Sequence, residues 1–393
     1  MPSWKTVCIL CSLLMLHNAQ RMAPVPLLEE LRIRLATDYV GAGNLFGAYL
    51  VTYALFTVPA GLLADRMDAK RLVTAGAALS MLASALFAVA GSYPIALVAR
   101  LGQGASGAIM YVPSLRYVVS SFPSQQRGTV MGFMEAGAGV GQIFALTALP
   151  FLAGRLELAQ AFLGVPVLAG LVLASILGGL HPSRSAAGSG KGSGDLLRLV
   201  RSTRFWYLVA FHFLGMLSIY ALLGWIPTYF RTQFGYSAVE AGLVASLLNL
   251  GMGAFSPLAG TISDRLRART PVVLAGSILL ALVLGMLMVT QDPLVALIAC
   301  ALGGVAIAFC IPVLMILAGE SFDRFGAGLA LSISGTAGQI GGSLSGSVFG
   351  YALEATGSFP IVWGLALAVG TLRLPLLFAV GERRRPAPEA GKT

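Results

Sequence analysis

The chain has 393 residues, of which 57% are hydrophobic and only 11% are charged, and its mean hydropathy is +0.83. These values lie far from those of soluble globular domains and predict an integral membrane protein. The formal net charge is +10, but the basic residues gather in loops expected on one side of a membrane, so the charge does not indicate nucleic-acid binding.

Hydrophobic runs in chain order predict twelve membrane-spanning helices, because a helix needs about 20 apolar residues to cross roughly 30 Å of hydrocarbon. The first six expected spans are 5–27, 40–63, 71–91, 94–118, 128–152 and 161–180. The second six are 204–229, 238–262, 271–290, 293–317, 326–352 and 359–380. We therefore expect an all-α membrane protein with twelve transmembrane helices in two pseudo-symmetric six-helix bundles.

A polar segment separates the sixth span from the seventh. Residues 185–194 read Ser-Ala-Ala-Gly-Ser-Gly-Lys-Gly-Ser-Gly, which is typical of a flexible linker. We expect an N-terminal bundle at 1–180, a cytoplasmic linker at 181–203, and a C-terminal bundle with a short basic tail at 204–393. Eighteen of the 26 Lys and Arg residues then fall on the cytoplasmic side, which predicts that both termini are cytoplasmic, in a bacterial inner membrane.

A short motif of Gly, Asp and Arg residues occurs once in each half of the chain. Residues 61–71 read GLLADRMDAKR and residues 260–269 read GTISDRLRAR, and the aspartates Asp65 and Asp264 lie 199 positions apart. Two further pairs repeat at an interval of 197 residues, Arg127 with Arg324 and Gln142 with Gln339. The two halves therefore read as copies of one six-helix unit.

These motifs resemble those of the major facilitator superfamily, whose loop between helices 2 and 3 carries Gly-x-Leu-x-Asp-Arg-x-Gly-x-Arg/Lys-Arg/Lys, with a weaker copy between helices 8 and 9. Asp68 and Arg267 stand where the family usually has glycine. The resemblance covers almost the whole chain and implies alternating access around a site near the membrane midplane. It also implies an ion pair between Asp65 and Arg116, and conformational or gating roles for Gly61, Asp65, Arg66, Arg71, Arg116, Asp264 and Arg265.

Two arginines lie inside the expected spans, where an unpartnered charge is costly. Arg21 in the first span and Arg100 in the fourth lie at similar depth, with His17 four residues before Arg21 and Gln103 three residues after Arg100. In the family, helices 1, 4, 7 and 10 line the central cavity, so the resemblance implies that both guanidinium groups face it and bind a carboxylate or phosphate. Two alternatives stay open: residues 100–104 resemble the family's Arg-x-x-Gln-Gly motif of helix 4, which favours a structural role, and Arg21 is within reach of Glu29 or Glu30.

Three other polar residues complete the candidate site. Tyr220 lies two turns after His212 in the seventh span, and Asn249 lies in the eighth span. We interpret both as substrate-binding residues, together with Arg21, Arg100, His17 and Gln103. Glu135 in the fifth span is the best candidate for proton coupling, and its alternative role is an ion pair with Arg116 or Arg127.

The sequence contains no phosphate-binding loop, no His and Cys residues at metal-binding spacing, and no large extramembrane domain. We therefore expect no enzyme activity, no cofactor and no metal site. The expected partners are a small-molecule substrate, membrane lipid and a proton as candidate coupling ion, with the chain as a monomer. The favoured function is a secondary transporter of a small organic solute, most of all an organic anion. The alternatives are a proton-coupled efflux pump for drugs or metabolites, and a transport-dead membrane sensor or assembly factor.

Overall fold

The structure, a computed structural model, describes residues 4–182, 198–322 and 327–380. The described part of the chain is helical and contains no strand. Ten of its helices are long and apolar enough to cross a membrane, and the helices α1 and α14 supply the first and eleventh of twelve passes. The prediction of an all-α membrane protein with twelve passes is confirmed.

The first six passes belong to one bundle. Its elements are α1 (Trp4–Met22), η1 (Val25–Leu27), α2 (Leu28–Arg34), α3 (Tyr39–Arg66), α4 (Ala69–Val89), α5 (Tyr93–Ser121), α6 (Ser124–Ile143), η2 (Phe144–Ala148), α7 (Leu149–Ala153) and α8 (Leu158–Gly179). The fifth pass consists of α6, η2 and α7, and η2 is a turn of π-helix. The first membrane helix ends earlier than expected, because Pro24 and Pro26 follow α1 and cannot extend it.

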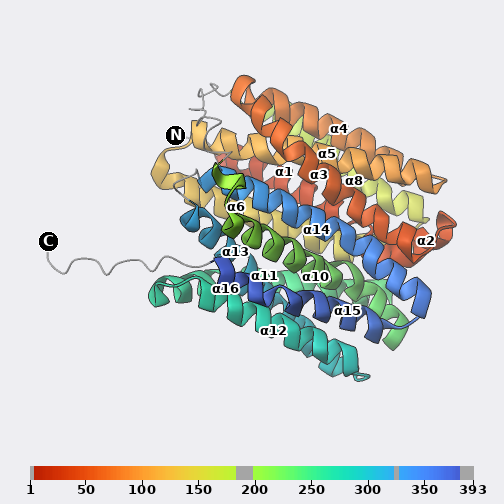
Figure 1. Cartoon of the computed structure of the whole chain (residues 1–393). Helices are drawn as coiled ribbons and strands as arrows, with labels where there is room; N and C mark the ends of the chain where they lie inside the picture. The colour runs from red at the N-terminus through yellow and green to blue at the C-terminus, as the bar shows by residue number, and fades with distance from the viewer. Residues whose placement is uncertain (1–3, 183–197, 323–326, 381–393) are drawn as a thin grey trace, which may run out of the picture.

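The last six passes belong to the second bundle. Its elements are α10 (Thr203–Phe234), α11 (Ala238–Leu266), α12 (Thr270–Val289), α13 (Pro293–Ser321), α14 (Ala327–Thr356), α15 (Phe359–Leu372) and α16 (Leu374–Val380). The twelfth pass consists of α15 and α16, which meet at Arg373. The passes run side by side in Figure 1, and α1 begins and α16 ends at the same end of the molecule. We call this the linker end, and the end that carries α2 the opposite end.

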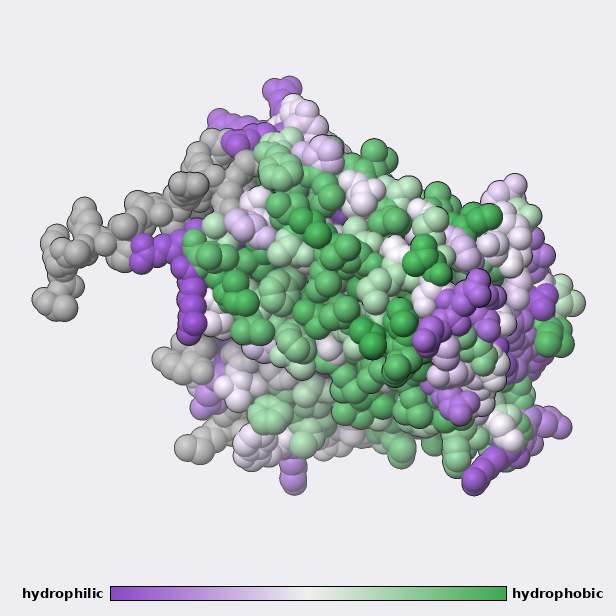
Figure 2. All heavy atoms as spheres, turned by 90° about the horizontal axis from the view of Figure 1, so that it is seen from below, coloured by the Kyte–Doolittle hydropathy of each residue, from purple (hydrophilic) through white to green (hydrophobic). Residues whose placement is uncertain are grey.

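The surface agrees with a position in the bilayer. Figure 2 shows a broad hydrophobic band across the middle of the molecule, with hydrophilic residues gathered toward its two ends. Large apolar side chains such as Leu82, Leu171 and Leu282 are at least 60% exposed on this surface. Apolar side chains in such numbers are stable on the outside of a protein only where lipid covers them.

The two bundles meet most closely where α3 of the first packs against α14 of the second. A Cβ atom on Gly43 would lie 2.3 Å from the carbonyl oxygen of Gly346, and one on Gly47 would lie 2.3 Å from the carbonyl oxygen of Ser343. Glycine therefore allows the two backbones to touch, as is common between helices in membranes. These residues lie in the first part of α3 and the last part of α14, which is the half of the molecule near the opposite end.

Polar contacts join the bundles in the same half. Arg231 at the end of α10 binds Glu30 of α2 through two hydrogen bonds of 2.7 and 2.8 Å. The backbone N–H of Tyr39 donates to Glu354 at 3.0 Å, and Ser347 donates to Asn44. The contacts described here hold the bundles together at the opposite end.

The glycine contact between the bundles generates a test. A Gly43→Ala change places a methyl group against the backbone of Gly346, so we expect a loss of about 1–3 kcal/mol of stability through overpacking. Gly132→Ala is the matched control, since it lies in the interior of α6 and a Cβ atom added there would have no other atom within 4 Å. Thermal unfolding of the purified protein in detergent should therefore show a lower midpoint for the first variant only. Equal midpoints for both variants would contradict the contact.

Candidate functional site

Each of the two repeated motifs forms a turn at the linker end, but the two turns differ in backbone conformation. In the first turn Asp68 is the N-cap of α4, and its carboxylate accepts hydrogen bonds from the N–H groups of Lys70 and Arg71 at 2.7 and 3.3 Å. An extended N-cap residue needs no glycine. In the second turn Arg267 takes a left-handed conformation with φ 52°, which explains why this position favours glycine.

The second motif is part of an ion-pair network. Arg269, 5% exposed, donates to Asp264 at 2.6 Å, to Ser263 at 2.8 Å, and to Glu320 of α13 at 3.2 Å. It thereby ties the ends of α11 and α13 to the start of α12. Arg265 lies exposed beside this network.

The first motif is described only in part. Arg66 and Arg71 are exposed at the linker end, and Gly61 packs near Val112 of α5. The side chain of Asp65 lies outside the described part of the chain, so its ion pair with Arg116 stays a prediction.

Arg21 lies in the last turn of α1, roughly 25 Å along the helix from Trp4. Its side chain is half-buried, and its Nε atom is buried with no hydrogen-bond partner in the part of the chain that the structure describes. Each of the side chains His17, Tyr49, Tyr53, Tyr111 and Glu135 lies within electrostatic range of it. Arg21 is thus a cation in the membrane, and its Nε donor has no acceptor among the described residues.

Aromatic rings from three helices gather beside Arg21. The ring of His17 on α1 lies 5.1 Å from that of Tyr53 on α3 and 5.8 Å from that of Tyr111 on α5. The Nδ1 atom of His17 is 2.7 Å from the hydroxyl of Tyr49, which lies one turn before Tyr53. His17 and Tyr49 are buried, whereas Tyr53 and Tyr111 are partly exposed. We call these four residues the aromatic cluster.

A glycine of α5 makes room for the cluster. A Cβ atom on Gly107 would lie 2.6 Å from the hydroxyl of Tyr49 and 2.7 Å from Nδ1 of His17. Any larger residue here would break the contact between His17 and Tyr49.

Arg100 is placed differently from Arg21. It is 0% exposed, and its guanidinium donates to the carbonyl oxygens of Leu45 at 2.7 Å, Gln20 at 2.6 Å and Arg21 at 3.3 Å. A further bond of 2.6 Å goes to the side chain of Gln103. The structure therefore does not bring Arg21 and Arg100 together as a joint anion site, because the donors of Arg100 are used inside the first bundle.

Arg100 provides hydrogen-bond donors that the end of α1 lacks. The last carbonyl groups of a helix have no partner within the helix, and the negative end of the helix dipole lies there. Arg100 supplies both donors and positive charge to the end of α1, and its guanidinium also lies 4.9 Å from the centre of the Tyr49 ring. It fixes the helix end that carries Arg21.

Gln103 and its neighbours extend this network to α4. The side chain of Gln103, 2% exposed, donates to Ser84 at 3.1 Å, and Gln20 donates to both Ser80 and Ser84 at 2.6 Å. Gln103 therefore links α5 to α4, where Ser84 also accepts from Gln20 of α1, and its side chain is buried in this conformation.

Tyr220 and Asn249 are the predicted residues of the second bundle. Tyr220 on α10 donates to Gln339 of α14 at 3.1 Å, and its ring lies 5.7 Å from that of Phe46 in the first bundle. It also lies within electrostatic range of Tyr49 and Tyr53, so it approaches the aromatic cluster from the other side. Asn249 donates to the carbonyl of Ala245 on its own helix at 3.3 Å, and no described contact connects it to the cluster.

Glu135 lies about three turns into α6, roughly 16 Å from the first residue of that helix. Its side chain is exposed, and it lies within electrostatic range of Arg21 and Tyr111. Arg127, one of its expected partners, donates instead to the carbonyl of Phe122 at 3.0 Å. The carboxylate thus belongs to the surroundings of Arg21.

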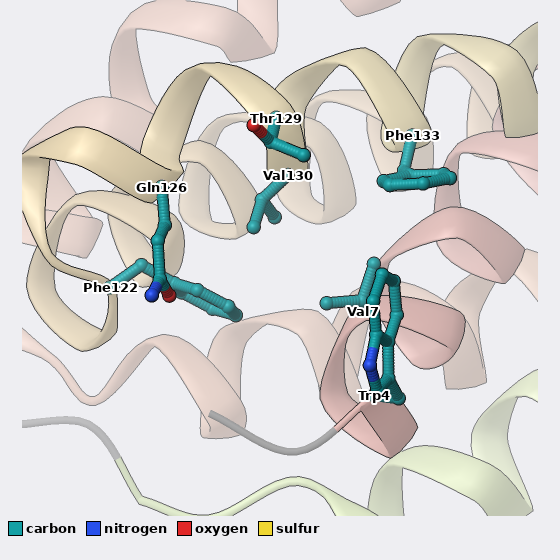
Figure 3. A pocket seen from close by; sticks show the side chains of 7 residues that line it. All are labelled: Trp4, Val7, Phe122, Gln126, Thr129, Val130 and Phe133. Atoms are coloured by element: carbon teal, nitrogen blue, oxygen red, sulfur yellow. The ribbon is translucent and has the colours of Figure 1, made fainter. Parts of the chain in front are cut away.

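A separate pocket of about 300 Å³ opens at the linker end between α1 and α6 (Figure 3). Its lining residues are Trp4, Val7, Phe122, Gln126, Thr129, Val130 and Phe133. The rings of Trp4 and Phe133 meet edge to face at 5.6 Å. The pocket shares no lining residue with the surroundings of Arg21 and was not predicted from the sequence.

The packing around Arg100 generates a test. Replacing Arg100 with Met should remove the hydrogen bonds to the end of α1 and lower the stability by about 1–3 kcal/mol, because buried carbonyls lose their donors. Arg32→Met is the control, since Arg32 pairs with Glu29 near the surface, with side chains 34% and 16% exposed, and such pairs contribute little. Thermal unfolding in detergent measures both variants. Equal unfolding midpoints for Arg100→Met and the wild type would refute the structural role.

The comparisons with known proteins agree with this architecture. The probable sulfoacetate transporter SauU of Cupriavidus necator is 26% identical over 93% of this chain and 91% of its own length. The probable anion transporter 4 of Oryza sativa subsp. japonica, a chloroplastic protein, is 26% identical over 97% of this chain and 69% of its own length. Among solved structures, the nucleoside transporter NupG superimposes with a TM-score of 0.81 at 16% identity, over 95% of this chain and 99% of that one, and so shows the fold.

The first two of these proteins are named as probable transporters, and the prediction that the chain is not an enzyme is confirmed. A family model described as the Major Facilitator Superfamily matches residues 9–346 and, in a second match, residues 212–393. The chain therefore belongs to the major facilitator superfamily.

Proposed function

We propose that this transporter carries a small organic anion and that Arg21 binds its acidic group. The observation that carries the proposal is the buried Nε of Arg21, which has no partner in the described part of the chain although the side chain lies in the membrane. A cation at such a depth costs about 2.5 kcal/mol or more unless it faces protein, water or a counter-ion. A carboxylate, sulfonate or phosphate would supply both the missing charge and the acceptor atoms.

The names of two relatives support an organic anion as the substrate. Two proteins similar to this chain over more than nine tenths of its length are named as probable transporters of sulfoacetate and of anions. Arg100 contributes without touching the substrate, because it holds the end of α1 in place and adds positive charge nearby. In this proposal Arg21 is the binding residue and Arg100 is a positioning residue.

The movement that we propose is alternating access, with 1–180 and 204–393 as the two moving units around the site. The contacts between Gly43 and Gly346 and between Glu30 and Arg231 close the opposite end in this conformation. The substrate then enters or leaves through the linker end. With the excess of basic residues at that end, we assign it to the cytoplasm of a bacterial inner membrane.

Glu135 is the residue that we propose for coupling to protons. An ionised Glu135 partly neutralises Arg21, and an incoming anion competes with it for the same guanidinium. The anion therefore binds more tightly after Glu135 takes up a proton, which would couple uptake of the anion to uptake of a proton. The exposure of Glu135 gives it access to water for that exchange.

The same carboxylate is what favours the second candidate, efflux of a cationic or amphipathic compound. In that case Glu135 would bind the cargo, and Arg21 would only balance its charge. The two candidates differ in which residue is indispensable for binding.

The anion proposal is tested by replacing Arg21. In proteoliposomes, uptake of labelled organic anions such as sulfoacetate, ascorbate and benzoate should occur with the wild type and fall about 10–100-fold in kcat/KM with Arg21→Ala, as expected for loss of a charged hydrogen bond. Arg21→Lys should fall less, because it keeps the charge but not the bidentate geometry. Arg155→Ala is the control, since Arg155 is exposed near Phe151 and distant in sequence from the site.

Anion transport that is unchanged in Arg21→Ala would refute the anion site. Transport of organic cations that depends on Glu135 but not on Arg21 would favour efflux. If the purified protein moves no solute while it stays folded, the transport-dead alternative is favoured.

The coupling proposal is tested by Glu135→Gln. This variant should still exchange anions across the membrane at equal pH, because binding at Arg21 remains. It should lose the accumulation that an imposed pH gradient drives in the wild type, since its side chain cannot bind or release a proton. Accumulation of equal size in both proteins would show that Glu135 is not the coupling residue.

A further inference from the structure

We infer that the anion bound at Arg21 is a planar aromatic carboxylate. The inference rests on the proposed function and narrows it from organic anions in general to one class. Its basis is the aromatic cluster beside Arg21, whose partly exposed members Tyr53 and Tyr111 come from α3 and α5.

The buried members of the cluster, His17 and Tyr49, pack against the partly exposed rings and fix them. His17 is 4% exposed and lies 5.1 Å from the ring of Tyr53 and 5.8 Å from that of Tyr111, at interplanar angles of 38° and 23°. Tyr49 stacks on Tyr53 at 6.5 Å with an angle of 9°, and Gly107 leaves the space that lets Tyr49 reach His17. Rings fixed in this way keep their orientation without a ligand, which lowers the cost of binding a flat molecule.

The distance from charge to ring suits a short aromatic acid. Arg21 lies four residues after His17 on α1, so one helical turn separates the guanidinium from the centre of the cluster. A carboxylate attached directly to a ring, or through a short side chain, can bind Arg21 while its ring packs against Tyr53 or Tyr111. Offset or edge-to-face packing of such rings contributes about 0.5–1.5 kcal/mol beyond the buried area, or roughly 2- to 13-fold in affinity.

Polar groups in the cluster fit ring substituents. The hydroxyl groups of Tyr53 and Tyr111 make no hydrogen bond to any residue that the structure describes, and both side chains are partly exposed. They are therefore available to a hydroxyl or ring nitrogen of the ligand. An aliphatic anion would leave the ring faces without an aromatic partner.

The second bundle supplies another ring to the same place. Tyr220 lies within electrostatic range of Tyr53, and its own hydroxyl is held by Gln339 of α14. A flat ligand against Tyr53 would thus lie near a residue of the second bundle as well. In this position the ligand can interact with both moving units.

The test compares two acids of equal charge and similar size, benzoate and cyclohexanecarboxylate, as competitors of anion uptake in proteoliposomes. In the wild type we expect benzoate to inhibit at a concentration roughly three- to tenfold lower. Tyr53→Phe and Tyr111→Phe keep the rings and should keep this ratio. Tyr53→Leu and Tyr111→Leu should bring the ratio close to one, while Tyr207→Leu, at an exposed tyrosine near the start of α10, should not change it.

A wild-type ratio near one, with inhibition by both acids still dependent on Arg21, would overturn the aromatic inference and leave anion transport standing. A ratio that survives both Leu substitutions would overturn it as well. If no anion is transported at all, the proposed function fails first, and the two failures are thereby distinguished. Thermal unfolding of each variant ensures that only folded protein is compared, and the ratio in the wild type decides the inference if a Leu variant does not fold.

Discussion

The first bundle depends on the hydrogen bonds from Arg100 to the end of α1. A membrane helix that stops inside the hydrocarbon leaves carbonyl groups without partners, and each such group is costly where no water is present. Arg100 reaches two of these carbonyls and one on α3, so a single side chain joins three helices. Because α1 can end there, Arg21 occupies its last turn instead of continuing toward the membrane surface.

The contacts between the bundles differ in kind from those within them. At the opposite end, glycines bring backbone against backbone between α3 and α14, and Glu30 pairs with Arg231. A glycine interface has few interdigitated side chains to separate, so it suits a boundary that must open and close. Within the first bundle, by contrast, Arg100 and Gln103 build a connected network of buried polar groups, which favours movement as one body.

Hydropathy and the repeated motif were sufficient to predict the twelve passes, because membrane thickness fixes helix length. The placement of Arg21 and Arg100 inside helices was also predicted, but the exposure of their side chains was not, since it depends on which carbonyls lie beside each guanidinium. The tyrosines Tyr53 and Tyr111 were missed because their rings meet His17 only after three helices are packed. Of the two motif aspartates, only Asp264 has a described ion-pair partner, Arg269. The sequence spacing had not identified Arg269 as that partner.

The second bundle also contains a buried arginine, Arg373, which is 1% exposed at the break between α15 and α16. It lies over the ring of Phe211 and donates to Ser277, so its described partners, like those of Arg100, carry no negative charge. The protein core therefore holds fixed positive charge when no cargo is present. Binding of an anion alone lowers this positive charge, so the membrane voltage then acts differently on the loaded and the empty carrier, whereas binding of an anion together with a proton leaves the charge unchanged.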